Sequence, residues 1–176
     1  MATTHSRTEK STGTAAAKKA GTSRSKNNAL ALLEKDHREV ETMFSEYEKI
    51  EDDSQKSALA EKICLALKVH TQMEEELLYP MAREETGEED LVAEAMVEHN
   101  TAKQLIREIE GSKSSDQMYD ARVKVLSEYV KHHVKEEEKQ LFPAIEKAGV
   151  DLDGLGEKLM ARKTELMEKT GKRAKS

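Results

Sequence analysis

Apolar positions from residue 28 onward recur every three or four residues, which is the period of an α-helix with one buried face. The first stripe consists of Leu30, Leu33, His37, Val40, Phe44 and Tyr47. Similar stripes run over residues 55 to about 86, 91–110, 116 to about 147, and 151–169. The second stripe predicts Leu77 and Met81 on its inner face, and the fourth predicts Ala144 there.

Short polar breaks separate these stripes. Residues 51–54 and 111–115 are polar, and Gly87 and Gly149 stand where helix C-caps belong. Connections this short place consecutive helices side by side and antiparallel. The pattern predicts an all-α fold: an up-down-up-down antiparallel four-helix bundle over residues 29–148, followed by a short additional C-terminal helix and tail over residues 149–176.

Composition agrees with a helical protein. Of 176 residues, 36% are charged and 3% are aromatic, with eight Gly and two Pro, which argues against a β-sandwich or an α/β enzyme. The single cysteine, Cys64, cannot form an internal disulfide, which favours a reducing compartment. With no apolar run near 18 residues and no apolar leader, we expect a cytoplasmic protein that does not contact membranes.

Charge is distributed unevenly along the chain. Residues 1–28 carry a net charge of +5, so the remainder carries −11 of the total of −6. The basic stretch is rich in Ser, Thr, Ala and Gly, and we expect a disordered N-terminal tail. An acidic body does not attract nucleic acid. The tail is interpreted as a solubilising arm, with weak DNA contact as the alternative.

An internal repeat carries the candidate chemistry. Residues 70–80 read HTQMEEELLYP and residues 133–143 read HVKEEEKQLFP, so both fit His-x-x-x-Glu-Glu-x-x-Leu-aromatic-Pro. The two copies are 63 residues apart and contain both prolines of the chain. Upstream, Asp36-His37 matches Glu98-His99. The sequence therefore predicts two copies of one helical hairpin.

Residues four apart lie on one helix face, so each His-x-x-x-Glu pair can bind one metal ion or two adjacent ions. Burying these histidines and glutamates without a metal would cost several kcal/mol. Zinc rarely uses so many ligands and calcium prefers oxygen alone, whereas iron suits imidazole with carboxylate. The predicted metal ligands are His37, His70, Glu74, His99, His133 and Glu137.

Each piece taken alone has an ordinary explanation. A single histidine on an apolar stripe is usually a hydrogen-bonded core residue, and an isolated His-x-x-x-Glu pair is usually a surface pair. His132 with Glu136 also has the ligand spacing, but the repeat favours His133. Glu41 follows His37 by four residues, whereas the matching position after His99 is Lys103. Whether His132 or Glu41 contributes stays open.

These residues, over about 29–147, resemble the hemerythrin-like HHE cation-binding family. The resemblance implies a four-helix bundle that holds a non-haem di-iron centre with an oxo or hydroxo bridge, manganese being the less favoured metal. It also implies that the four histidines are terminal ligands and that Glu74 and Glu137 bridge the irons. The family's oxygen carriers have a histidine where this chain has Lys103, which leaves an open position on each metal.

Two adjacent open positions suit a small bridging molecule. The hypothesis is a protein that binds O₂, H₂O₂ or NO and breaks down peroxide in a catalase-like or peroxidase-like reaction. An iron, oxygen or redox sensor, or a metal-binding module without catalysis, is the alternative. Tyr47 and Tyr129 are candidate proton donors near the inner faces, with a packing role as the alternative. The oligomeric state and redox partner do not follow from the sequence.

Overall fold

The computed structural model describes residues 28–173, and every regular element within them is helical. The predicted all-α class is therefore confirmed for this part of the chain. The predicted basic tail lies, apart from Asn28, outside the described residues. The elements are α1 (Ala29–Tyr47), α2 (Asp53–Met73), η1 (Glu74–Leu78), α3 (Tyr79–Thr86), α4 (Glu89–Glu110), α5 (Tyr119–Glu136), η2 (Glu137–Leu141), α6 (Phe142–Ala148) and α7 (Leu152–Arg173).

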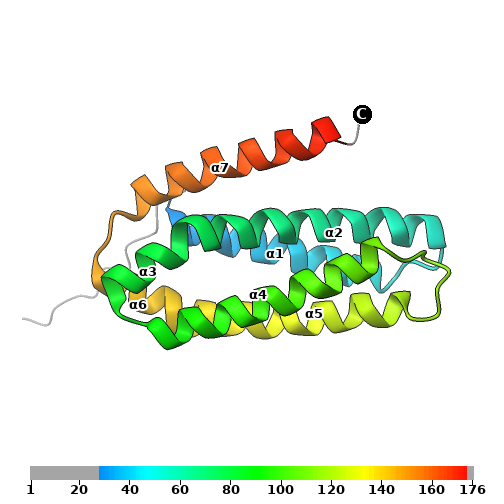
Figure 1. The fold of residues 1–176 in the computed structure, drawn as a ribbon, viewed down its shortest axis with the longest axis horizontal. Helices are drawn as coiled ribbons and strands as arrows, with labels where there is room; N and C mark the ends of the chain where they lie inside the picture. Colours follow the sequence, from blue (N-terminus) through cyan, green and yellow to red (C-terminus); the bar gives the residue numbers. More distant parts are fainter. Residues whose placement is uncertain (1–27, 174–176) are drawn as a thin grey trace, which may run out of the picture.

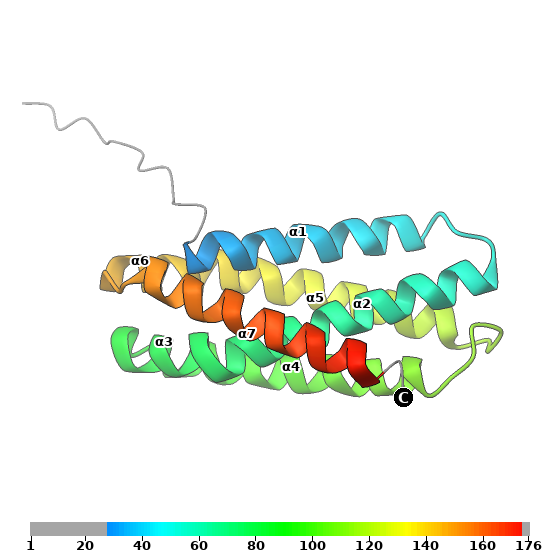
Figure 2. The same ribbon diagram turned by 90° about the horizontal axis from the view of Figure 1, so that it is seen from above.

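Four rods lie side by side along the long axis of the molecule (Figure 1). Two of them are single helices, α1 and α4, and two are composite, α2–η1–α3 and α5–η2–α6. Contacts run from α1 to α2, from α2 to α4, from α4 to α5 and from α5 back to α1. Helix α7 packs outside this group against α1 and α2 (Figure 2). None of the described helices is long and apolar enough to cross a membrane.

Local signals in the sequence account for most helix ends. The Asn28 side chain accepts a hydrogen bond from the Leu30 backbone N–H at 3.0 Å and so caps α1. Gly87 and Gly149 end α3 and α6 with φ of 71° and 74°, the left-handed region that favours glycine. Both glycines were predicted as C-caps, and that prediction is confirmed.

The start of α5 differs from the prediction. The sequence pattern places it at Asp116, but the helix begins three residues later, at Tyr119. The Asp116 side chain accepts a hydrogen bond from the Met118 backbone N–H at 3.1 Å. This local turn competes with the first helical turn, which explains the later start.

The two composite rods each contain one wide π-helical turn, which a regular period of 3.6 residues does not predict. In η1 the Tyr79 N–H bonds to the Glu74 carbonyl, and in η2 the Phe142 N–H bonds to the Glu137 carbonyl, both across five residues. A proline follows directly in each rod and has no N–H with which to continue the α-helical ladder.

The extra residue in each π turn shifts the buried face of the helix that comes after it. In the second rod the predicted inward positions Leu77 and Met81 are only partly buried, while Leu78 and Ala82 are fully buried. In the fourth rod Ile145 is buried in place of the predicted Ala144. The predicted register was therefore wrong from Leu77 onward in the second rod and at Ala144 in the fourth, by the one residue that a π turn adds.

Two apolar cores lie along the rods, one on each side of the four histidines. The first contains the N-terminal part of α1 together with α3, α6 and α7, and the second contains the other ends of α1, α2, α4 and α5. In α1, His37 lies between Leu33 of the first core and Val40 of the second. The histidines thus form a polar layer between two hydrophobic cores.

Candidate metal centre

Each rod contributes one histidine to this layer: His37 from α1, His70 from α2, His99 from α4 and His133 from α5. All four are buried. The Nε2 atoms of His37 and His70 are 3.0 Å apart, and those of His99 and His133 are 3.2 Å apart. The histidines therefore form two close pairs, one from each copy of the repeat.

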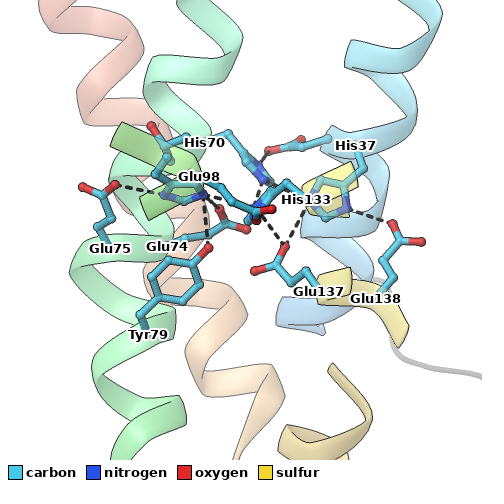
Figure 3. A network of polar contacts seen from close by, with 12 residues as sticks. His37, His70, Glu74, Glu75, Tyr79, Glu98, His133, Glu137 and Glu138 are labelled. Atoms are coloured by element: carbon cyan, nitrogen blue, oxygen red, sulfur yellow. Dashed lines mark hydrogen bonds and ion pairs between the residues drawn. The ribbon is translucent and has the colours of Figure 1, made fainter. Parts of the chain in front are cut away.

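Two glutamates from the π turns lie between the histidine pairs (Figure 3). Glu74 is fully buried, with Oε1 at 3.0 Å from Nε2 of His70 and Oε2 at 3.3 Å from Nε2 of His99. Oε2 of Glu137 lies 3.4 Å from Nε2 of His37 and 3.8 Å from Nε2 of His133. Each carboxylate thus faces both histidine pairs. The structure brings together all six residues that the sequence singled out.

A carboxylate faces the Nδ1 atom of each of these four histidines. The Nδ1 partners are Glu138 for His37 at 2.8 Å, Glu75 for His99 at 2.9 Å, Glu98 for His133 at 2.9 Å, and Asp36 for His70 at 3.8 Å. At His37, His99 and His133 the carboxylate is within hydrogen-bond distance, so it holds the ring proton on Nδ1 and leaves Nε2 available to a metal ion. Asp36 is too far from Nδ1 of His70 for a hydrogen bond.

These four acids have no predicted role from the sequence, although the matched segments of the two copies contain them. Glu75 and Glu138 directly follow the two glutamates predicted as ligands, and Asp36 and Glu98 each directly precede a histidine predicted as a ligand. An acid next to four of the six predicted ligands, at matched positions of the two copies, was the available signal. The position of an acid in the sequence does not show which histidine it contacts. Glu138, for example, adjoins Glu137 in the sequence but bonds to His37 of the other repeat.

Three of these acids are also paired with a lysine or arginine. Lys103 contacts both oxygens of Glu75 at 2.5 Å, Arg38 contacts Glu138 at 2.5 Å, and Lys163 of α7 contacts Asp36 at 2.5 Å. Lys103, which departs from the oxygen-carrier pattern, therefore supports a carboxylate beside His99. Glu41 pairs with Arg38 at 3.1 Å on the surface and lies outside the cluster.

The charges of this network reinforce one another. Burial favours the neutral acid at Glu74, but the imidazoles of His70 and His99 outweigh it and hold its pKa well below the ordinary value. Burial lowers the pKa of His70, yet Glu74 and Asp36 overcome this and raise it to about 10. Hydrogen bonds from His99 and Lys103 lower the pKa of Glu75. The centre is built for positive charge between its carboxylates.

The donor atoms fit a metal ion. A neutral imidazole that donates through Nδ1 carries a lone pair on Nε2, and two such lone pairs 3.0 Å apart repel unless a cation or proton lies between them. Ligands at right angles around an ion, about 2.1 Å from it, are about 3.0 Å apart. The four carboxylate oxygens of Glu74 and Glu137 accept no hydrogen bond although they are buried.

Two sets of ligand atoms share one carboxylate. The first set is His37, His70, Glu74 and Glu137, and the second is Glu74, His99 and His133. Within each set, one ligand atom per residue lies within 4.8 Å of all the others. The arrangement can therefore hold two adjacent cations with Glu74 between them.

The two sets differ in an aromatic residue that sequence reasoning missed. The Tyr79 hydroxyl oxygen lies 3.1 Å from Nε2 of His99, in the second set. The matching residue of the other repeat, Phe142, stacks on His37 with ring centroids 6.0 Å apart and offers no oxygen. Burial, together with the charges of Glu74 and Glu137, raises the pKa of Tyr79 well above its ordinary value. The centre is therefore chemically asymmetric.

Of the two tyrosines proposed from the sequence, Tyr47 lies away from the centre and Tyr129 lies beside it. The structure does not bring Tyr47 to the centre, because its hydroxyl donates to Asp120 at 2.7 Å beside Lys56. Tyr129 is 44% exposed and lines a chamber next to the histidines. The repeat contained the signal for Tyr79, as the aromatic position before each proline.

We expect Glu138→Ala to weaken metal binding about tenfold or more, because His37 loses the carboxylate that orients its ring. Glu138→Gln should weaken binding less, since the amide oxygen still accepts from Nδ1. Competition with a coloured chelator measures both affinities. The matched control is Glu128→Ala, an exposed glutamate of α5. An unchanged affinity in Glu138→Ala would contradict the orienting role.

The fold and the site together define a class: an all-helical protein with a buried cluster of histidines and glutamates suited to cations. The sequence model described as the Hemerythrin HHE cation binding domain matches residues 28–154. The chain belongs to this family, as the resemblance implied.

Two similar proteins give this assignment its context. A DNA nickase from Nostoc sp. (strain PCC 7120 / SAG 25.82 / UTEX 2576) is 31% identical over 125 residues, covering 71% of this chain. The chain spans about a third of that relative, 35% of its length. The crystal structure of a hemerythrin HHE cation binding domain-containing protein from Mycobacterium kansasii superposes with a TM-score of 0.74 at 21% identity. It covers 85% of this chain and 93% of that one. This second likeness concerns the fold.

Proposed function

We propose that this protein is a non-haem di-iron protein that binds small oxidants and breaks down hydrogen peroxide. Its proposed ligands are His37 and His70 at one iron, His99 and His133 at the other, and the carboxylates of Glu74 and Glu137 shared between them. Iron is favoured over manganese because four imidazoles dominate the donor set. The up-down-up-down four-helix bundle expected from the sequence is part of this proposal, and the ring of contacts among the four rods supports it.

The observation that carries the proposal is a small chamber beside the histidines. All four histidines line it, together with Val40, Leu67, Ala102, Val130 and Val134. The space open to the centres of water-sized molecules is about 20 Å³, enough for one or two molecules the size of water or peroxide. The most exposed lining residue is Tyr129. A chamber of this size favours O₂, NO or H₂O₂ over any larger substrate.

Two irons supply, when bound, the two-electron redox chemistry by which two H₂O₂ become two H₂O and one O₂. The protein's own residues do the rest. The carboxylates at Nδ1 fix the imidazole rings, and the apolar walls of the chamber limit access of water. The Tyr79 hydroxyl oxygen lies 3.1 Å from Nε2 of His99, so its O–H is close enough to donate a hydrogen bond at the second set of ligands.

Peroxide turnover tests this role of Tyr79. We expect iron-loaded wild type to release O₂ over many turnovers. Tyr79→Phe should lower the rate on the order of a hundredfold, the lower end of what a positioned proton donor contributes. An oxygen electrode measures the rate per bound iron. Tyr47→Phe is the matched control and should turn over like wild type, since Tyr47 belongs to the second core and its hydroxyl bonds to the exposed Asp120.

The outcomes separate the parts of the proposal. Equal rates in wild type and Tyr79→Phe would remove Tyr79 from the reaction while leaving the iron chemistry in place. An iron-loaded wild type without multiple turnovers would contradict peroxide breakdown and leave reversible binding of O₂ or NO.

A redox or iron sensor is the second candidate, and contacts of α7 favour it. Lys163 pairs with Asp36, which faces His70, and Arg162 binds both oxygens of Glu76 in η1 at 2.6 and 2.9 Å. A change in the charge of the centre would thus alter the position of α7 through the Lys163–Asp36 and Arg162–Glu76 pairs. If iron oxidation alters the proteolytic sensitivity of α7 while peroxide turnover is negligible, the sensor is the better description.

A further inference from the structure

A third group of ligand-type side chains lies on the outer side of α5, where that helix faces α4. It consists of Glu98, His132 and Glu136. Nε2 of His132 is 3.5 Å from Oε1 of Glu98 and 3.5 Å from Oε2 of Glu136. The His132 side chain is 57% exposed, whereas the Glu98 side chain is only 13% exposed. The group therefore lies at the surface directly outside His133.

These distances suit ligands of a shared ion better than hydrogen bonds. Charge-assisted N–H···O bonds have lengths of about 2.7–2.9 Å. Two ligands of a tetrahedral ion, each about 2.1 Å from the metal, are about 3.4 Å apart. Both separations in this group are close to that value. Two carboxylates against one imidazole also leave a net negative charge for a divalent cation to balance.

The surface group connects to the buried centre through one residue and one pocket. Glu98 directs Oε1 at His132 and accepts a hydrogen bond from Nδ1 of His133 through Oε2 at 2.9 Å. A pocket of about 20 Å³ contains Glu98 and Glu136 in its lining and is bounded inside by His133 and Glu137. The Glu137 side chain is 2% exposed and both of its oxygens accept no hydrogen bond. Carboxylates therefore line this pocket from the surface, at Glu136 and Glu98, to the buried centre, at Glu137.

The other copy of the repeat has no such group. The positions that match His132 and Glu136, 63 residues earlier, are Val69 and Met73. Both are buried in the apolar core that also contains Leu159 of α7. The bundle thus tolerates apolar residues at these positions where α7 covers them. On the uncovered side, the same positions carry an imidazole and a carboxylate at ligand spacing.

We propose that Glu98, His132 and Glu136 form a surface site for a divalent transition-metal ion that loads the buried centre. The binding site stands on its own geometry, whereas the loading role rests on the proposed metal function of the centre. An Fe²⁺ ion held here would transfer inward past Glu98 to the carboxylate of Glu137 and the imidazole of His133. Metal ions would then enter through the second copy of the repeat. The matching positions of the first copy, Val69 and Met73, are covered by α7 and offer no ligand atoms at the surface.

Cobalt binding to the metal-free, full-length protein tests the proposal, because the visible absorption of Co²⁺ reports its coordination. We expect wild type to bind three ions per chain, the third at least tenfold more weakly than the other two. His132→Ala and Glu136→Gln should bind two. With limiting Co²⁺ in a stopped-flow experiment, both variants should fill the centre at least fivefold more slowly than wild type, yet reach the same final spectrum.

The matched control is Glu128→Gln, which removes an exposed carboxylate from the same helix and should load like wild type. An identical final spectrum in the two variants would show that Glu98 still orients His133 when the surface site is removed. If both variants bind three ions and load as fast as wild type, the surface site is wrong. If wild type binds one ion and His132→Ala binds none, the surface site stands and the buried centre fails.

Discussion

Glu74→Gln is expected to reduce bound metal from two ions per chain to one or none. Glu74 has one oxygen toward His70 and the other toward His99, so it belongs to both sets of ligands. Gln keeps the shape but removes the negative charge that balances the cations. Loss of one partner from a buried charged cluster costs about 3 kcal/mol or more, which corresponds to over a hundredfold in affinity.

Elemental analysis after gel filtration measures this loss, and circular dichroism establishes that the variant is folded. Glu84→Gln, an exposed glutamate of α3 on the same rod, is the matched control and should retain both ions. A folded Glu74→Gln protein with two tightly bound ions would contradict the shared carboxylate.

Removal of the metal should lower the thermal midpoint by roughly 20 °C. An ion present at a thousandfold excess over its Kd stabilises the folded chain by about 4 kcal/mol, and two ions by about twice that. For a chain of this size each kcal/mol corresponds to about 2–4 °C. Without cations, the buried carboxylates of Glu74 and Glu137 and the four imidazoles lose the charge that balances them.

Melting curves of the loaded and chelator-treated protein measure this shift, and adding Fe²⁺ back anaerobically should restore the midpoint. The same chelator should change the midpoint of Glu74→Gln far less, since that variant has less metal to lose. Equal midpoints for loaded and metal-free wild type would mean that the cluster is satisfied by protons and acts as a packing layer.

The sequence predicted the helices and the six clustered residues because both depend on short-range periodicity. The stripe from Leu30 to Tyr47 is buried along α1 as predicted. The repeat located His37, His70, Glu74 and their counterparts because residues four apart share a helix face in any register. Their roles as ligands, and the boundaries of the domain, remain predictions.

Features that depend on packing between rods did not follow from the sequence. The π turns arise where a proline interrupts the hydrogen-bond ladder, and they move Leu78 and Tyr79 inward in place of Leu77. That shift brings the Tyr79 hydroxyl to His99 while Tyr47 bonds elsewhere. Two of the four pairings between carboxylates and Nδ1 atoms, Glu138 with His37 and Glu75 with His99, cross between the repeats, and no local pattern specifies them.

The central claim is that this bundle holds two iron ions between its two histidine pairs. Elemental analysis of the protein purified from iron-supplied cells, with total iron and manganese measured against protein concentration, tests it most directly. We expect about two irons per chain in wild type and a marked loss of iron in His133→Ala. A folded wild-type protein that contains neither iron nor manganese, and takes up neither when supplied, would contradict it.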